Sequence, residues 1–542
     1  MPWRPTAAIS ARAVPPCPAR AEGPATLCST QVQDHTISRE PRGLQSGSPG
    51  TGKPAPGGYV TALPGPPAGN VAGSPQAVPG DGRHSPGPVS MATFFIRTYG
   101  CQMNERDSEL LACLLSERGH TPVAAEEQAD VILLNTCSVR DQAERKAVGK
   151  AGLLKRLKRE RPSLVIGIIG CMAQAYGRAL LERLPHVDLV VGPDQLQDIP
   201  DLLEDALAGG HGLVATAVRP DIPGDMSRHV PGSAFASVAV MRGCDQFCSY
   251  CIVPQTRGRE RSRPVDEIVR EVQHLAAGGT REILLLGQNI TAYGIAEARR
   301  AGTFAPERSP FADLLRAVHD VPGIARIRFT SPHIRYMNDA FIDTVCALPK
   351  VCKAFHIPVQ SGSDRILRLM HRGYTAADYL RVIAAIRARL DRVAFSTDVI
   401  VGFPSETAED FAATRELMQR VGFDMAYIFR YSPRRGTQAA DKHPDDVGAD
   451  EKLRRNKVLL EDLEAGVEVR NQAYVGECLE VLPEGPSLRN PTRWQGRSDT
   501  AKVVIFEPLA GIKPGDLVHV RIARATAHSL FGTASYSPFL PK

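Results

Sequence analysis

The 542-residue sequence contains no secretory signal and no apolar run of 20 residues. Because a helix needs about 20 apolar residues to cross a bilayer, we expect no membrane association. Twelve cysteines in such a chain favour metal ligation in a reducing compartment over disulfides, and the cytoplasm is the expected location. The net charge is only +6, so whole-chain charge does not by itself indicate a nucleic-acid partner.

Residues 1–90 have few large apolar residues and no hydrophobic period, and about a third of them are proline or glycine. Such a segment cannot bury enough surface to offset its ordering entropy, so we expect disorder. Arg4, Arg12 and Arg20 precede the first acidic residue, Glu22, as in an organellar transit peptide, but nearby prolines oppose the helix that such a peptide needs. Another alternative is that translation starts at Met91, where the first folded segment begins.

From residue 91 to about 220, short apolar runs alternate with helical segments, which predicts a parallel sheet covered by helices. Three runs, 94–100, 131–136 and 165–170, end in Cys101, Cys137 and Cys171. Because parallel strands end on one edge of a sheet, these cysteines are expected to converge and to hold an iron–sulfur cluster with one open iron. The alternative is that a small residue fits a crowded strand end, and Cys113, in a helical segment, is predicted to be core.

Another cysteine triad, Cys244, Cys248 and Cys251, follows the apolar run 236–241 in a C-x3-C-x2-C spacing, with no fourth cysteine nearby. Three thiolates can hold three irons of a 4Fe-4S cubane and leave the fourth open to the amino and carboxylate groups of a small molecule. A structural zinc site is the alternative, because C-x2-C is also zinc spacing. Its next ligand would be His274, which lies in a segment predicted to be the exposed turn of a helix.

The chain after this loop continues the alternation of strands and helices. The predicted strands are 283–286, 324–329, 354–359, 393–401 and 425–429, and the predicted helices are 265–277, 311–318, 340–348, 377–390 and 409–421. Together with the first strand, they predict a partial TIM-type (βα)6 barrel in an α/β protein. Polar loops follow the second, fourth and fifth strands, at the end where such barrels carry functional residues.

Residues 447–473 predict a helix with a solvated charged face, which leads to a last domain. Short alternating strands at 477–482, 501–506 and 516–522 then predict a small antiparallel β-barrel. With a Pro/Gly-bearing link at 220–234, the predicted domains are 1–90, 91–220, 221–472 and 473–542.

Both cysteine triads lie in motifs that resemble a known family. The C-x3-C-x2-C loop resembles the radical S-adenosylmethionine (SAM) superfamily. Residues 98–104 (TYGCQMN), 135–140 (NTCSVR) and 170–174 (GCMAQ) resemble the N-terminal domain of the methylthiotransferases, in the form of the branch that modifies tRNA, the tRNA-2-methylthio-N6-dimethylallyladenosine synthases. The last domain resembles TRAM, an OB-like RNA-binding module, so the likeness covers roughly residues 91–537.

The resemblance implies a radical SAM enzyme with two 4Fe-4S clusters and SAM. Cys101, Cys137 and Cys171 would hold an auxiliary cluster that carries sulfur, and the other triad would hold the cluster that cleaves SAM to a 5′-deoxyadenosyl radical. One SAM would methylate the sulfur, and the radical from a second would activate C2 of N6-isopentenyladenosine beside the anticodon. The expected partners are the tRNA anticodon stem-loop and a reductant protein such as flavodoxin or ferredoxin, and the chain is expected to be a monomer.

The family likeness and the strand-end positions also nominate contact residues. For SAM they are Tyr250, at the position where the superfamily places an aromatic residue against adenine, with Gly287, Gln288, Ser361 and Asp398. The alternatives are packing for Tyr250, strand-end capping for the polar residues and ordinary turn chemistry for the glycine.

For RNA, the candidates are Arg257 and Arg259, beside the cluster loop, and Arg493, Trp494 and Arg497 in the last domain. The alternatives are a solvated helix lead-in for the first two and core packing for Trp494. Pro433-Arg434-Arg435 is more basic than the family usually is before Gly-Thr.

Two other functions also fit the sequence. One is that of the sister enzyme that methylthiolates an aspartate of a ribosomal protein, although the Gln-Met-Asn after Cys101 and the segment around Trp494 oppose it. The other is that of an iron–sulfur protein that binds RNA without turnover.

Overall fold

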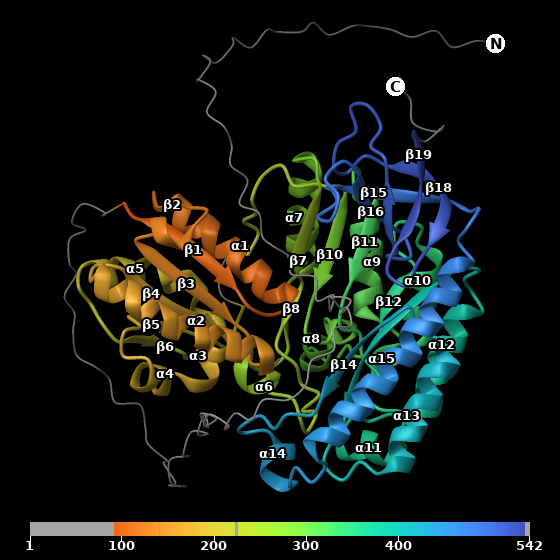
Figure 1. The fold of residues 1–542 in the computed structure, drawn as a ribbon, viewed down its shortest axis with the longest axis horizontal. Coiled ribbons are helices and arrows are strands. Elements are labelled where there is room, and N and C mark those ends of the chain that lie inside the picture. The colour runs from red at the N-terminus through yellow and green to blue at the C-terminus, as the bar shows by residue number, and fades with distance from the viewer. Residues whose placement is uncertain (1–90, 140, 223–225, 537–542) are drawn as a thin grey trace, which may run out of the picture. The chain divides into compact units, whose positions relative to one another are not determined.

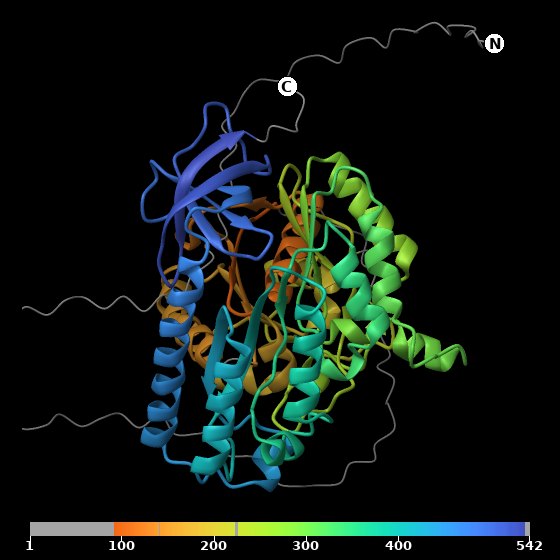
Figure 2. The same cartoon turned by 90° about the vertical axis from the view of Figure 1, so that its right-hand side faces the viewer.

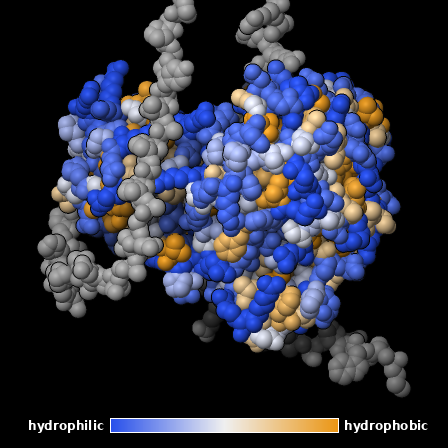
Figure 3. All heavy atoms as spheres, turned by 90° about the horizontal axis from the view of Figure 1, so that it is seen from below, coloured by the Kyte–Doolittle hydropathy of each residue, from blue (hydrophilic) through white to orange (hydrophobic). Residues whose placement is uncertain are grey.

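The structure is a computed structural model that describes residues 91–139, 141–222 and 226–536. The predictions for residues 1–90 lie outside the described residues. Among the described helices, each is too short or too polar to cross a bilayer. The face drawn in Figure 3 is mostly hydrophilic, with apolar residues scattered over it.

The first domain is built on a parallel six-stranded sheet with the strand order β2-β1-β3-β4-β5-β6 (Figure 1). The strands are β1 (Thr93–Thr98), β2 (Thr121–Pro122), β3 (Val131–Thr136), β4 (Val165–Gly170), β5 (Leu189–Val191) and β6 (Leu213–Ala215). The helices are α1 (Gln102–Glu117), α2 (Asp141–Glu160), α3 (Cys171–Tyr176), α4 (Arg178–Arg183) and α5 (Ile199–Leu207), with 3-10 turns η1 (Glu126–Gln128) and η2 (Pro193–Asp198).

Both faces of this sheet are covered. Successive residues of β3 point to opposite sides, so Ile132 and Leu134 join one apolar cluster, whereas Val131 and Leu133 join another. Every residue of β3 and of β4 is buried, as continuous apolar runs predict for central parallel strands. Because β3 and β4 are held in the core along their whole length, the cysteine that follows each of them lies at the edge of the sheet.

The central domain is a partial barrel of six parallel strands in two hydrogen-bonded groups, β7-β10-β11 and β12-β13-β14. A bridge between Ile327 and Val351 lies between the groups. The strands are β7 (Phe235–Ala239), β10 (Glu282–Leu286), β11 (Arg326–Phe329), β12 (Ala354–His356), β13 (Ala394–Val401) and β14 (Met425–Arg430), with a short antiparallel pair, β8 (Met241–Arg242) and β9 (Arg261–Ser262).

Helices cover the outside of this barrel (Figure 2). The helices of this domain are α6 (Val253–Thr256), α7 (Val265–Ala277), α8 (Ile295–Arg300), α9 (Pro310–His319), α10 (Asp339–Ala347), α11 (Asp364–Leu369), α12 (Ala376–Arg387), α13 (Ala408–Val421) and α14 (Gln438–Lys442), with 3-10 turns η3 (Ile290–Ala292) and η4 (Ile334–Tyr336). The six predicted strands and five predicted helices are confirmed. The strand predicted over 354–359 ends early, at His356, ahead of Pro358, which has no N–H for a strand ladder.

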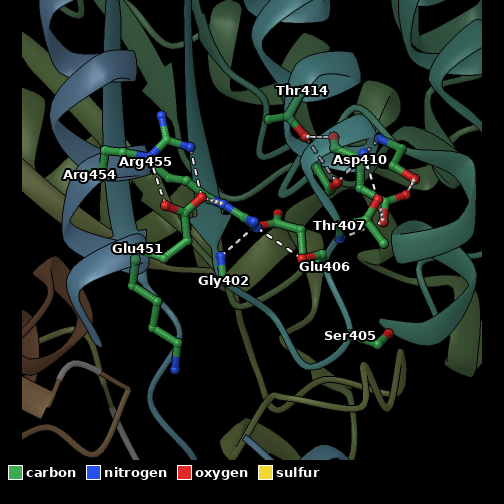
Figure 4. A network of polar contacts seen from close by, with 12 residues as sticks. Gly402, Ser405, Glu406, Thr407, Asp410, Thr414, Glu451, Arg454 and Arg455 are labelled. Carbon is green, nitrogen blue, oxygen red and sulfur yellow. Dashed lines mark hydrogen bonds and ion pairs between the residues drawn. The ribbon is translucent and has the colours of Figure 1, made fainter. Parts of the chain in front are cut away.

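Helix α15 (Ala449–Gln472) connects the barrel to the last domain. Near its start, Arg455 donates to Glu406 at 2.6 Å, and Glu406 accepts from the Gly402 N–H at 2.6 Å (Figure 4). Near its end, Asn471 donates to the Thr526 carbonyl at 2.7 Å. The prediction of a solvated charged face holds only in part, because Arg455 and Lys452 are buried against the loop after β13.

The last domain is a closed five-stranded barrel with the order β15-β16-β17-β19-β18. Its strands are β15 (Cys478–Pro486), β16 (Trp494–Ser498), β17 (Val503–Phe506), β18 (Val518–Ala525) and β19 (Leu530–Tyr536). The sequence did not predict β16 and β19, which contain Gly496 and Gly532, where a Cβ would lie within 2.5 Å of a neighbouring strand's carbonyl. The barrel is also not wholly antiparallel, since β17 and β19 pair in parallel.

Candidate active site

The second cysteine triad lies on one tight loop just after β7 and β8, at the C-terminal end of the barrel strands. Gly243 has φ +81°, and a Cβ there would lie 2.0 Å from the carbonyl oxygen of Arg259. The Cys244 N–H donates to the Gly258 carbonyl at 3.2 Å. The segment over 257–259 therefore packs directly against the loop that carries Cys244, Cys248 and Cys251.

These thiols influence one another's protonation. Burial and the neighbouring Cys251 raise the pKa of Cys244, and burial and Cys248 raise the pKa of Cys251 to about 12. Arg372 donates to the Cys248 sulfur at 3.3 Å. Thiols with raised pKa values ionise at neutral pH only when a strongly cationic group binds them, as metal centres do. The loop therefore fits a metal group that binds thiolates.

The zinc alternative needs a fourth ligand beside the three cysteines. His274, the alternative zinc ligand, is exposed on α7 and lines a surface hollow with Cys113. Cys113 itself is half-buried, so the prediction that it belongs to the core is wrong. The loop therefore fits a cluster better than zinc.

Two of the predicted SAM contacts lie directly against the cluster loop. The Gln288 side-chain oxygen accepts from the Gly243 N–H at 2.6 Å. Gly287 lets the end of β10 approach Met241, since a Cβ there would lie 2.7 Å from that side chain. Both residues thus position the loop, and their contact with SAM stays a prediction.

Tyr250 and Asp398 also remain candidates. Tyr250 is partly buried beside Phe403 and Tyr431, and its hydroxyl accepts from Arg372 at 3.4 Å. Asp398 lies on β13 with its side chain 27% exposed, 3.5 Å from His356 Nε2. Its carboxylate therefore keeps accessible surface for a ligand.

The prediction that Ser361 contacts SAM is wrong. This residue is fully buried, and its hydroxyl lies 3.2 Å from the Thr414 hydroxyl and accepts from the Ser363 N–H at 3.2 Å. The hydroxyl is therefore unavailable to a ligand. The structure shows the alternative, in which the side chain caps the loop after β12.

The first cysteine triad lies at the ends of three adjacent strands, as the sequence predicted. Cys101 follows β1 after two residues, and Cys137 and Cys171 directly follow β3 and β4. A hydrogen bond from Cys137 and the charge of Arg257 lower the pKa of Cys101 to about 5, whereas burial raises the pKa of Cys171. The structure thus brings the three thiols together, and the cluster they would hold stays a prediction.

Arg257 enters this first triad from the barrel domain. It is 4% exposed, and its Nη2 donates to Asp107 at 2.9 Å and to Asn104 at 3.0 Å. The prediction that Arg257 grips RNA is therefore wrong, and so is the alternative of a solvated lead-in. Arg259 is different: its side chain is 73% exposed and pairs with Asp245 at 2.7 Å, so it stays an RNA candidate.

Sequence reasoning assigned no role to Asp107, Asn104 or Arg372. Asp107 is buried, and it accepts from Arg242 at 2.5 Å and from Arg257 at 2.9 Å. The available signal was an acidic residue on the apolar face of α1, which also carries Met103. Arg372 follows α11 in a loop with no pattern that marks it.

The RNA candidates of the last domain lie at the other end of the barrel. Arg326, at the start of β11, donates to the Arg497 carbonyl at 2.6 Å, whereas the cluster loop follows the strand ends. The side chains of Arg493 and Arg497 are less than half exposed, and Trp494 packs partly against the core of this domain. All three remain predictions, and they do not converge with Arg259.

The basic segment before Gly436 has a structural role. Arg434 lies 3.3 Å from Asp141 of α2 and 4.0 Å from Glu144, with a side chain only 14% exposed. It therefore ties the loop after β14 to the first domain.

His229 predicts a pH dependence of stability. Burial alone would lower its pKa, but hydrogen bonds to Glu109 and Glu271 raise the pKa of His229 above its usual value. Its stabilising effect is complete below the unfolded pKa, about 6.5, and is lost as pH rises through the raised folded value.

We therefore expect His229→Gln to lower the melting temperature clearly near pH 6 and less near pH 9, in thermal melts at both values. Arg263, which also pairs with Glu271 at 2.7 Å, is retained in both proteins. An equal loss at the two pH values would show that the charge of His229 does not contribute.

Comparisons with known protein families agree with this architecture. Residues 93–192 match the family described as "Uncharacterized protein family UPF0004", residues 238–418 match the radical SAM superfamily and residues 472–534 match the TRAM domain. The radical SAM match implies a 4Fe-4S cluster and SAM. It therefore confirms that part of the cofactor prediction.

Curated relatives resemble the chain over most of its length. A tRNA-2-methylthio-N(6)-dimethylallyladenosine synthase of Opitutus terrae is 45% identical over 468 residues, which cover 81% of this chain and 96% of that protein. The enzyme of that name from Moorella thermoacetica is 44% identical over 443 residues, covering 81% and 98%. Among solved structures, the radical SAM methyltransferase TsrM from Kitasatospora setae has a TM-score of 0.46 at 15% identity, covering 63% of this chain and 75% of that one.

Identity at this level extends over nearly the whole length of these relatives and through all three matched domains, which occur in the predicted order. The chain thus belongs to the tRNA-2-methylthio-N(6)-dimethylallyladenosine synthases, a family of radical SAM methylthiotransferases.

Proposed function

We propose that this protein transfers a methylthio group to C2 of N6-isopentenyladenosine next to the anticodon of tRNA. The observation that carries the proposal is the pair of separate cysteine triads, one on the barrel's cluster loop and one at three adjacent strand ends. Adding sulfur to an unactivated ring carbon requires both a means of activating that carbon and a sulfur-rich site. Two triads supply one site for each task.

In this proposal, Cys244, Cys248 and Cys251 hold the 4Fe-4S cluster, and Cys101, Cys137 and Cys171 hold a second one. When bound, the two clusters would supply the electron that cleaves one SAM to a 5′-deoxyadenosyl radical and the sulfur that a second SAM methylates. The chain's own residues position these sites. Gln288 holds the cluster loop through the Gly243 N–H, and Arg372 donates to Cys248.

The RNA would be bound at two places along the barrel. Arg259 is exposed beside the cluster loop, and Trp494 lies in the TRAM domain with Arg493 and Arg497. An anticodon-loop base suits such a site because it is cheaper to splay out than a base in a duplex. The proposal also includes a flavodoxin-like or ferredoxin-like reductant, a monomeric state, and action in the cytoplasm, the expected compartment of the tRNA substrate.

Expression of the chain in a host without its own methylthiotransferase is expected to restore 2-methylthio-N6-isopentenyladenosine in total tRNA, measured by nucleoside mass spectrometry. A Cys248→Ala chain is the matched control and should leave N6-isopentenyladenosine unmodified. If that nucleoside also persists in cells that contain soluble, iron-loaded wild-type protein, the tRNA substrate is wrong, and the aspartate of the ribosomal protein is tested next.

A further inference from the structure

Arg257 carries a buried N–H donor that lacks a nitrogen or oxygen acceptor. Its Nη2 donates to Asp107 and Asn104, whereas Nη1 has no nitrogen or oxygen acceptor among the residues that the structure describes, and the guanidinium also interacts with the Cys171 thiol. Leaving a buried donor unpaired is costly, and more so on a charged group. The position of Nη1 therefore points to an acceptor that belongs in this site when the protein works.

The surroundings define the chemistry of that acceptor. The Arg257 guanidinium interacts with the thiols of Cys171 and Cys101, and Cys137 contacts Cys101. Thiolates select soft metals and iron–sulfur clusters, and a cluster held by three thiolates would leave one iron free for a soft sulfur ligand. The open acceptor position therefore adjoins a sulfur-rich site.

Positive charge lies beside this site. Arg242 and Arg257 are both buried, and both pair with the carboxylate of Asp107. A buried cation that is not fully neutralised favours an anion beside it. The acceptor is thus expected to carry negative charge.

We infer that Arg257 is a positioning residue for sulfur: its Nη1 donates a hydrogen bond to a small sulfur anion, hydrosulfide or methanethiolate, held among Cys101, Cys137 and Cys171. This inference rests on the second-cluster part of the proposed function. The relatives named above are 2-methylthio synthases, so a sulfur atom must be delivered, and the first triad combines three thiols with a free cationic donor.

The same segment also connects the two cysteine triads. One residue after Arg257, the Gly258 carbonyl accepts from the Cys244 N–H at 3.2 Å. Four residues after Arg257, Arg261 forms an ion pair with Asp194 of the first domain at 3.0 Å. Residues 257–261 are therefore held both by the cluster loop and by the first domain. These contacts fix the position of the Arg257 guanidinium relative to the cluster loop.

The test uses the full-length chain with Cys244, Cys248 and Cys251 replaced by alanine, so that only the first triad can take up iron. The parent and an added Arg257→Gln, Arg257→Lys or Arg270→Gln change are reconstituted with iron and sulfide. Methanethiolate is then titrated into each while the EPR and visible spectra of the cluster are recorded, and each midpoint potential is measured. Arg270 is an exposed arginine on α7 and serves as the matched control.

We expect Arg257→Gln to bind methanethiolate at least about tenfold more weakly, which is the loss of roughly one hydrogen bond to a charged group. Its midpoint potential should move to more negative values, because a nearby positive charge favours the reduced cluster. A tenfold change in the ratio of reduced to oxidised cluster corresponds to about 59 mV for one electron. Arg257→Lys keeps the positive charge but not the guanidinium donor. Its midpoint potential should therefore lie closer to that of the parent than its affinity for methanethiolate does.

The outcomes separate the inference from the proposed function. A parent that takes up no iron would refute the second cluster itself. A parent and an Arg257→Gln protein that both hold iron, with equal thiolate affinity and potential, would refute the role of Arg257. If Arg257→Gln does not retain iron, Arg257→Lys decides: weaker thiolate binding supports the inference, and unchanged binding refutes it.

Discussion

A Cys137→Ala protein is expected to cleave SAM reductively at close to the wild-type rate and to lose methylthio transfer to tRNA. Cys137 follows β3 and contacts Cys101, whereas the residues proposed to hold the other cluster lie on a separate loop after β8. Outer-shell changes at metal sites already cost about 10–100-fold in activity, so loss of a ligand should reduce transfer by more than about a hundredfold.

Both products can be quantified in one anaerobic reaction, with 5′-deoxyadenosine reporting cleavage of SAM and the 2-methylthio nucleoside reporting transfer. Cys248→Ala should abolish both products. Cys113→Ser, a change in the half-buried thiol of α1 outside both triads, should abolish neither. Sulfur insertion by Cys137→Ala would show that the two triads do not divide the work in this way.

An Asp107→Asn protein is expected to be less stable by about 3–5 kcal/mol, the usual cost of removing one partner from a buried ion pair. Asp107 is 1% exposed and is the carboxylate that Arg242 and Arg257 share. Asparagine keeps the shape but removes the charge, so both guanidiniums stay buried without it. Because Arg242 and Arg257 come from the barrel domain, contact between the two domains should weaken as well.

Chemical denaturation of the wild-type and variant chains in parallel measures this effect. Asp266→Asn is the control, since Asp266 pairs with Arg270 on the exposed side of α7, where water screens the charges. It should leave the transition almost unchanged. A comparable midpoint for Asp107→Asn and the wild type would mean that another anion, such as the Cys101 thiolate, neutralises the two arginines.

Local patterns were enough to predict the six strands and five of the helices of the barrel, and three of the six strands of the first domain. Each of these strands is a short apolar run followed by polar or glycine residues, and each predicted helix shows an apolar stripe. Such patterns involve residues that are close together along the chain, so they can be recognised without knowledge of the fold. The strands β2, β5 and β6 were not predicted, because each has only two or three residues. β16 and β19 were missed because Gly496 and Gly532 interrupt the alternation, and only the close approach of the neighbouring strands explains these glycines.

The same distinction applies to the candidate site residues. The grouping of the cysteines was predictable because each triad has its own local spacing or follows its own strand, and their role as cluster ligands stays a prediction. Arg257 and Ser361 were assigned wrongly because their partners are distant in sequence: Asp107 lies 150 residues from Arg257, and Thr414 lies 53 residues from Ser361. An exposed arginine and a buried one look alike in a sequence segment.

Periodicity and spacing along the chain were therefore sufficient to predict the three folded domains, their order and the two cysteine triads. Long-range packing makes Arg257 buried beside Cys101 and Cys171 while Arg259, two residues away, remains exposed. That outcome depends on which distant side chains pack around each guanidinium. The free energy of burying a charge is set by those partners and not by its neighbours along the chain.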